Sequence, residues 1–145
     1  MKLLIRKATH EDASGLSELF VELVGEQSDI GALKKQLLFV DTQPNYYVAV
    51  ACLDNKVVGT AMGIVCVDLV GNCAPFLLIE NVVVSSKCQK LGIGKKLMTE
   101  LENFAIQHHC NFILLASSHE REEAHRFYES LGYKDKKKGF FKQLS

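Results

Sequence analysis

Two glycines and two lysines after a run of valines form the stretch of this sequence that best predicts chemistry. They lie in VVVSSKCQKLGIGKKLM, residues 82–98, where Gly92 and Gly94 are followed by Lys95 and Lys96. Glycines at a strand-to-helix turn let the backbone approach a ligand closely, and the free N–H groups at the start of the helix favour an anion. The pattern indicates a phosphate site, although a plain strand-to-helix turn has the same pattern.

Two common phosphate-binding motifs do not fit this turn. A P-loop has a glycine five residues before its Gly-Lys pair and Ser or Thr after it, and these positions are Gln89 and Lys96 here. A dinucleotide-binding fingerprint has a third glycine at the position of Leu97 and lies in the first unit of a parallel sheet. A nucleotide-binding module is therefore the weaker interpretation.

The turn must be positioned by the elements around it, and these alternate between strand and helix without a linker. Short apolar runs rich in β-branched residues predict strands at residues 2–8, 45–53, 56–69, 76–84, 111–117 and 140–144. Apolar residues at helical spacing predict helices over residues 13–24, around 33–38, from 93 to 105 and over 121–132.

Local signals mark several ends of these elements. Thr9 and Asp12 have the spacing of a helix-capping pair, and Gly132 closes the last helix. Asp54-Asn55 between two apolar runs predicts an antiparallel hairpin. We therefore expect one mixed α/β domain over residues 1–145.

Composition narrows the classes of function. Lys plus Arg and Asp plus Glu each number 17, so no basic excess indicates a nucleic-acid partner. The start, MKLLIRK, has too few apolar residues for a signal peptide, and no apolar run is long enough to span a membrane. The 5 cysteines include no CxxC pair, which favours reduced thiols in the cytoplasm.

No metal site is expected from the spacing of possible ligands. His108, His109 and Cys110 are consecutive, so their side chains project in different directions. No second pair of ligands has metal spacing.

The turn and the late helix resemble the GCN5-related N-acetyltransferases (GNAT). QKLGIG, residues 89–94, is similar to the family's Gln/Arg-x-x-Gly-x-Gly/Ala motif. Residues 79–98 resemble its fourth strand, pyrophosphate loop and third helix, and EAHRFYESLGY, residues 123–133, resembles its late helix. The resemblance implies an α/β (α+β) fold with a central, mostly antiparallel twisted sheet, splayed fourth and fifth strands, and about four helices. The first forty residues match in pattern only.

The resemblance also implies that acetyl-CoA is the cosubstrate. The backbone of Val82, Val83 and Val84 is expected to pair with the pantetheine arm as an added strand. The N–H groups from Leu91 to Lys95 are expected to hold the pyrophosphate. The implied cofactor-binding set is Val82, Val83, Val84, Gln89, Lys90, Leu91, Gly92, Ile93, Gly94, Lys95 and Arg121. Arg121 departs from the family, which often has asparagine there.

Acetyl transfer to an amine needs groups that move protons. An amine with a pKa of about 10 must lose a proton before it attacks, and a carboxylate is the usual base. Glu80, just before the valines, is the candidate, although it fits equally a carboxylate that hydrogen-bonds the backbone where strands splay. A backbone N–H near Val83 or Val84 is expected to stabilise the developing oxyanion.

Tyr128 occupies the family's tyrosine position and is expected to protonate the departing thiolate. It also lies on an apolar helical stripe with Ala124, Phe127 and Leu131, so a core tyrosine is the alternative. His119 and His125 flank the same segment and are more typical of surface or capping histidines than of ligand contacts.

The acceptor is the least defined part of the prediction. Three acidic residues lie near the expected acceptor site: Glu26, Asp29 and Asp68. They favour a cationic amine as acceptor, and the alternative is that each is an ordinary loop carboxylate. We expect a small-molecule amine, with neither nucleic acid nor membrane as a partner, and the resemblance also implies a homodimer. A protein or peptide N-acetyltransferase and a non-catalytic acyl-CoA sensor are the alternatives.

Overall fold

The computed structural model describes residues 2–118 and 120–145, and its internal contacts divide the chain into two compact units, residues 1–114 and 115–145. The first unit begins with β1 (Leu3–Lys7), a short 3₁₀ turn η1 (His10–Asp12), α1 (Ala13–Val24) and α2 (Ile30–Asp41). It continues with β2 (Tyr46–Leu53), β3 (Lys56–Cys66), β4 (Phe76–Val84), η2 (Ser86–Cys88) and α3 (Ile93–Gln107). Strand β5 (Ile113–Leu115) follows across the boundary between the units.

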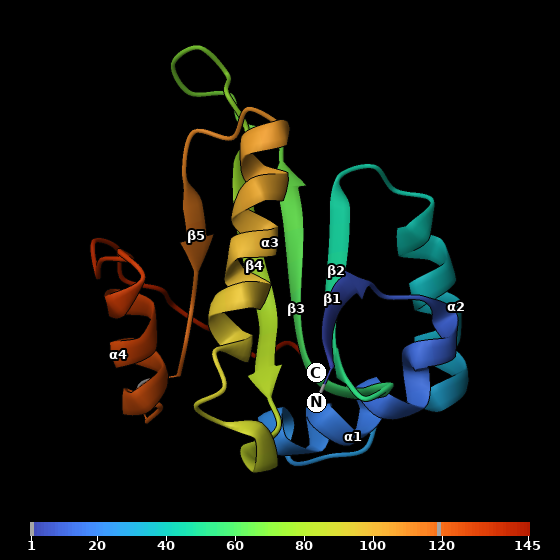
Figure 1. The fold of residues 1–145 in the computed structure, drawn as a ribbon. Helices are drawn as coiled ribbons and strands as arrows, with labels where there is room; N and C mark the ends of the chain where they lie inside the picture. Colours follow the sequence, from blue (N-terminus) through green and yellow to red (C-terminus); the bar gives the residue numbers. More distant parts are fainter. Residues whose placement is uncertain (1, 119) are drawn as a thin grey trace. The chain divides into compact units, whose positions relative to one another are not determined.

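The strands form one five-stranded sheet in the order β1-β2-β3-β4-β5 (Figure 1). The first three pairings are antiparallel. The predicted hairpin between β2 and β3 is confirmed, since Asp54 and Asn55 both have positive φ, 49° and 68°. Strand β5 is shorter than the predicted 111–117, and the Leu77 N–H donates to the Phe112 carbonyl beside it at 3.0 Å.

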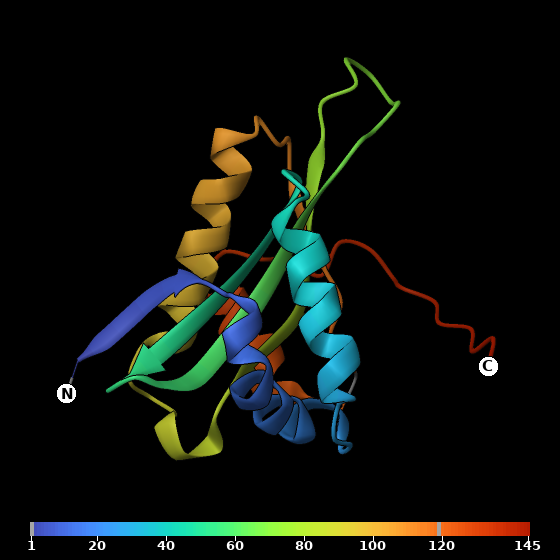
Figure 2. The same ribbon diagram turned by 90° about the vertical axis from the view of Figure 1, so that its right-hand side faces the viewer.

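Helix α3 covers one face of this sheet, and α1 and α2 cover the other (Figure 2). Two glycines of β3 allow the close approach of α3. A Cβ at Gly59 would lie 3.1 Å from Ile93 and Leu97, and one at Gly63 would lie 3.3 Å from Leu101. The helix therefore packs its apolar stripe directly on the backbone of β3.

The opposite face holds a second apolar cluster beneath α1 and α2. Its buried members include Leu16, Leu37 and Val50. The predicted capping pair is confirmed at the entry to α1. Thr9 and Asp12 form a reciprocal capping box, and Arg6 donates two hydrogen bonds to the Asp12 carboxylate at 2.8 and 2.9 Å.

The second unit contains α4 (Glu122–Ser130), shorter than the predicted 121–132, and Gly132 follows it with φ +95° as expected for a helix end. The predicted strand over residues 140–144 is wrong, because residues 134–145 form no strand. Phe140 and Phe141 of this segment are 90% and 87% exposed. The sequence pattern of the segment resembles a strand, but no neighbouring strand pairs with it within the described part of the chain.

Within the described residues, the five-stranded sheet with four α-helices confirms the predicted fold class. Over residues 2–118 and 120–145, no helix is both long and apolar enough to cross a membrane.

Candidate active site

A bulge in β4 sets the direction of the residues that the sequence singled out. Thr60 pairs with Val83 and Met62 pairs with Glu80, so Ala61 lies opposite two residues of β4, Asn81 and Val82. Asn81 has φ +59°, the left-handed conformation that asparagine tolerates better than most residues. Such a bulge bends the strand and redirects the side chains next to it.

Glu80 lies directly before the bulge, on the face covered by α1 and α2. Directly paired residues point to the same face of a sheet, and the partner of Glu80, Met62, lines a pocket on that face. The Glu80 side chain is exposed, and within the described part of the chain it makes no hydrogen bond or ion pair. Its carboxylate is therefore free to accept a proton from a ligand on this face.

The loop after β4 is held by two side chains. The Ser86 N–H donates to the Glu22 carboxylate of α1 at 2.9 Å. The Gln89 side-chain amide donates to the Val84 carbonyl at 2.9 Å. The Gln89 side chain is thus bonded to the loop itself, which leaves ligand contact to its backbone. The sequence analysis missed Glu22, because nothing in a helical glutamate signals a partner more than sixty residues away.

The glycine turn leaves the start of α3 open. Gly92, the residue before the helix, has φ +76°, and Lys90 has φ +65°. No side chain among the described residues caps the helix, so its first N–H groups, Ile93 to Lys95, are available to a ligand. A Cβ at Gly92 would meet no atom within 4 Å, so the space above the turn is open.

Four exposed lysines surround this helix start: Lys87, Lys90, Lys95 and Lys96. Their charges add to the positive end of the helix dipole. Open N–H groups, open space and four lysines nearby in the sequence are features that could hold a phosphate group of a ligand. The residues present therefore fit the pyrophosphate of coenzyme A.

Tyr128 belongs to the second unit and lies on α4 with 8% of its surface exposed. Burial raises the pKa of its hydroxyl, and the positive charge of Arg121 partly opposes that rise. The phenol therefore keeps its proton at neutral pH and is able to donate it. Phe127 and Tyr133 contact its ring, with centroids 5.3 and 6.1 Å away.

The residues around α4 have different roles. Arg121 immediately precedes the helix and is exposed, so its guanidinium is open to a ligand. The His125 ring nitrogen Nε2 lies 2.8 Å from the Ser118 carbonyl, which ties α4 to the preceding loop. Ser117 Oγ is buried and has no hydrogen-bond partner among the described residues. His119 lies outside the described residues.

Residues outside these sites have ordinary local partners. Asp29 caps α2 by accepting from the Ala32 N–H at 3.0 Å, and Asp68 accepts from the Leu69 N–H at 2.8 Å. The His108 ring Nδ1 lies 3.0 Å from the Phe104 carbonyl. Over residues 2–118 and 120–145 no three His, Cys, Asp or Glu side chains group as metal ligands.

Comparison with known proteins shows which proteins this chain resembles. The sequence pattern of the "Acetyltransferase (GNAT) family" matches residues 3–133. An uncharacterized N-acetyltransferase of Methanocaldococcus jannaschii is 32% identical over 136 residues, which cover 93% of this chain and 80% of that protein.

Solved structures have a similar fold. A putative acetyltransferase from Agrobacterium tumefaciens is 27% identical, with a TM-score of 0.87 over 97% of this chain and 99% of that one. An aminoglycoside acetyltransferase from an uncultured soil metagenomic sample, solved in complex with trehalose, is 26% identical. Its TM-score is 0.81, over 99% of this chain and 97% of that one.

Proposed function

The chain belongs to the GNAT family of acetyltransferases, and we propose that it transfers the acetyl group of acetyl-CoA to a primary amine of a small molecule. The observation that carries this proposal is the uncapped, lysine-flanked start of α3 directly after the bulged strand β4. The two features together offer a diphosphate site and, next to it, a strand along which an extended thioester arm can lie.

Coenzyme A binding is assigned to β4 and the turn after it. The N–H groups from Leu91 to Lys95 hold the pyrophosphate, and the nearby lysines balance its charge. The backbone of Val82 to Val84 pairs with the pantetheine arm. Gln89 keeps the loop in shape through its bond to the Val84 carbonyl. Bound in this way, acetyl-CoA supplies a thioester carbonyl that an amine can attack directly.

Glu80 is the proposed base for that attack. It lies one residue before the bulge, exposed, and on the face that carries the pocket described below. It removes the proton that the amine loses as the nitrogen bonds to the thioester carbonyl. A backbone N–H near Val83 or Val84 stabilises the negative charge that develops on the carbonyl oxygen.

Tyr128 is the proposed acid for the leaving group. When the carbon–sulfur bond breaks, the thiolate of CoA takes the phenolic proton, and the amine has become an N-acetyl amide. The raised pKa of Tyr128 is consistent with this role, because the phenol carries its proton at neutral pH.

The similar aminoglycoside acetyltransferase supports a small-molecule acceptor, and the match to the family across residues 3–133 supports a single domain. The five cysteines are free, which suits the reducing cytoplasm. We also propose a homodimer, because Phe140, Phe141 and Leu144 are each at least 87% exposed and large apolar side chains favour a covering partner.

The experiment follows release of free thiol from acetyl-CoA while amines, polyamines, amino acids, aminoglycosides and short peptides are offered, with thermal shift by CoA alongside. Release with one class of amine supports the transferase and identifies its acceptor class. Stabilisation by CoA without release with any acceptor favours an acyl-CoA sensor. If CoA does not stabilise the protein and no thiol is released, the assignment of the glycine turn to CoA is contradicted.

A further inference from the structure

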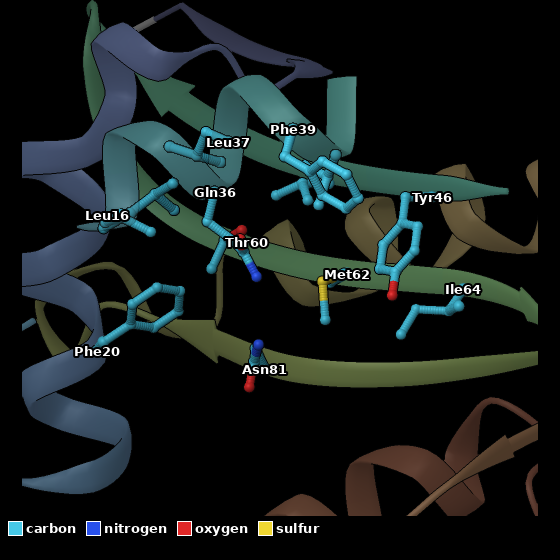
Figure 3. A pocket seen from close by; sticks show the side chains of 13 residues that line it. Leu16, Phe20, Gln36, Leu37, Phe39, Tyr46, Thr60, Met62, Ile64 and Asn81 are labelled. Atoms are coloured by element: carbon cyan, nitrogen blue, oxygen red, sulfur yellow. The ribbon is translucent and has the colours of Figure 1, made fainter. Parts of the chain in front are cut away.

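A pocket of about 280 Å³ lies in the first unit between α1, α2 and the central strands (Figure 3). Its walls include Leu16 and Phe20 from α1, Leu37 and Phe39 from α2, Met62 from β3 and Asn81 from β4. Phe39 is 56% exposed, so the pocket is open at the α2 end. The pocket is large enough for a small organic molecule, since an apolar cavity of about 150 Å³ holds benzene.

The lining carries no charged side chain. Nine of its 13 residues are aliphatic, methionine or phenylalanine, and the others are Gln36, Tyr46, Thr60 and Asn81. The acidic residues that would favour a cationic acceptor do not line it, and two of them, Asp29 and Asp68, already accept backbone hydrogen bonds. A cationic group that enters this pocket loses water without meeting a counter-charge, which is costly.

The polar groups of the lining are few and neutral. The Thr60 hydroxyl donates to the Ala49 carbonyl at 2.8 Å and is therefore satisfied. The side chains of Gln36, Tyr46 and Asn81 have no hydrogen-bond partner within the described part of the chain, so each is able to bind a polar atom of a ligand. In Figure 3 Phe20 lies at the opposite side of the pocket from Phe39 and Tyr46, so the three rings do not form a cage around a cation.

One end of the pocket meets the proposed reaction site. Asn81 is both a lining residue and the bulge residue of β4, and Glu80 directly precedes it on the same face. The residues proposed to hold the thioester arm, Val82 to Val84, follow it. An amine beside Glu80 therefore has the rest of its molecule directed into the apolar lining.

We propose that the acceptor is a monoamine that carries an uncharged apolar group, aliphatic or aromatic, and that this group fills the pocket. This inference rests on the proposed function, because it assigns the pocket to the acceptor of that reaction. The single ammonium remains at the Glu80 end, where it loses its proton. Polyamines and aminoglycosides carry further charges that the lining does not balance, so they are poor acceptors.

The first test compares acetylation of 4-phenylbutylamine and hexylamine with that of spermidine and kanamycin, under one set of acetyl-CoA conditions. We expect kcat/KM to be about 100-fold higher for the apolar amines. The same amines are also titrated into the protein calorimetrically, with and without CoA. CoA lacks the acetyl group, so this measurement reports binding without turnover.

Two neighbouring residues of α2 give a matched pair of variants. Phe39 and Leu38 are 56% and 52% exposed, but only Phe39 lines the pocket. Neither is a core residue, so both alanine variants should fold. We expect Phe39→Ala to raise KM for 4-phenylbutylamine roughly tenfold with little change in kcat. Leu38→Ala should leave both constants within about twofold.

The outcomes separate this inference from the proposed function. Turnover that is fastest with spermidine or kanamycin overturns the apolar acceptor and leaves the transferase intact. Saturable binding of apolar amines that Phe39→Ala weakens, without transfer to any amine, supports the pocket assignment and contradicts the proposed function. No saturable binding of either apolar amine, or equal effects of the two variants, overturns the inference.

Discussion

Tyr128 is a buried phenol whose pKa is raised by desolvation, against the opposing charge of Arg121. A Tyr128→Phe variant keeps the ring and removes only the hydroxyl. Because a thiolate is already a tolerable leaving group, we expect kcat to fall by about 10²-fold rather than to zero. Stopped-flow thiol release under saturating substrates measures this. Near-normal turnover in the variant would exclude Tyr128 as the acid.

The effect of replacing Glu80 should depend on pH, because its proposed role is to deprotonate the acceptor amine. Glu80→Gln should lower kcat/KM by roughly 10²-fold at neutral pH. The loss should shrink as pH rises towards about 10, where a larger fraction of a primary amine is already neutral. A pH–rate profile measures this, with Glu18→Gln, an exposed change on α1, as control. A deficit that stays constant with pH contradicts the base assignment.

The sequence singled out both residues as candidates but did not show their surroundings. Neither the side of the sheet that Glu80 faces nor the role of Asn81 is readable from the sequence, because a bulge breaks the two-residue alternation of a strand. The one sequence signal for the bulge was Asn81 itself, because asparagine tolerates positive φ better than most residues.

The glycine turn at the start of α3 is the proposed coenzyme A site, and its backbone conformation allows a test. Gly92→Ala forces a side chain into left-handed backbone at φ +76° without any clash, a strain of about 1–2 kcal/mol. Gly25→Ala is the matched control, since Gly25 has φ +80°, equal open space and a place at the end of α1. We expect similar losses of stability in both variants, but an approximately tenfold loss of CoA affinity only in Gly92→Ala. Equal CoA affinities would contradict the assignment of the turn to CoA.

The capping box at the start of α1 gives an element-scale dependence on pH. Burial tends to raise the pKa of Asp12, but hydrogen bonds from Arg6 and from the Thr9 N–H outweigh it, so the pKa is lowered. The folded state therefore binds the Asp12 proton more weakly than the unfolded chain. The stabilisation is complete above the unfolded pKa of about 3.9 and is lost as pH falls through the lower folded value.

Asp12→Asn tests this directly. It should lower the free energy of unfolding by about 1–2 kcal/mol at pH 7, because it removes a charged partner of Arg6 and Thr9. Urea unfolding from pH 7 to pH 2 should show the difference between variant and wild type shrinking at the acidic end. A difference independent of pH would mean that the Asp12 charge does not contribute.

The elements themselves were largely readable from the sequence. The predicted strand at residues 76–84 matches β4 at both ends, and the Asp54-Asn55 turn is where the sequence indicated. Strand β5 lies within the predicted range but covers only Ile113–Leu115, and the strand predicted at residues 140–144 was wrong. An apolar pattern shows that a segment could pair but not that a partner strand lies beside it. Residues 140–144 have the apolar pattern of a strand, but they pair with no strand within the described part of the chain.

At the scale of the whole molecule, the exposed apolar side chains near the end of the chain bear on assembly. Phe140→Ser with Phe141→Ser should convert the proposed homodimer to monomer, because it removes two large apolar surfaces. Lys134→Ser with Lys136→Ser in the same segment is the control. Light scattering after size exclusion measures the mass, and a monomeric wild type at every concentration would contradict the dimer.

The most direct test of the central claim is mass spectrometry of the amine after incubation with acetyl-CoA and the enzyme. The account predicts an N-acetylated amine, gained in step with free CoA and strongly reduced when Tyr128→Phe and Glu80→Gln are combined. Free CoA without an acetylated amine, for every amine class offered, would mean that the acetyl group passes to water, and would contradict the proposed transfer.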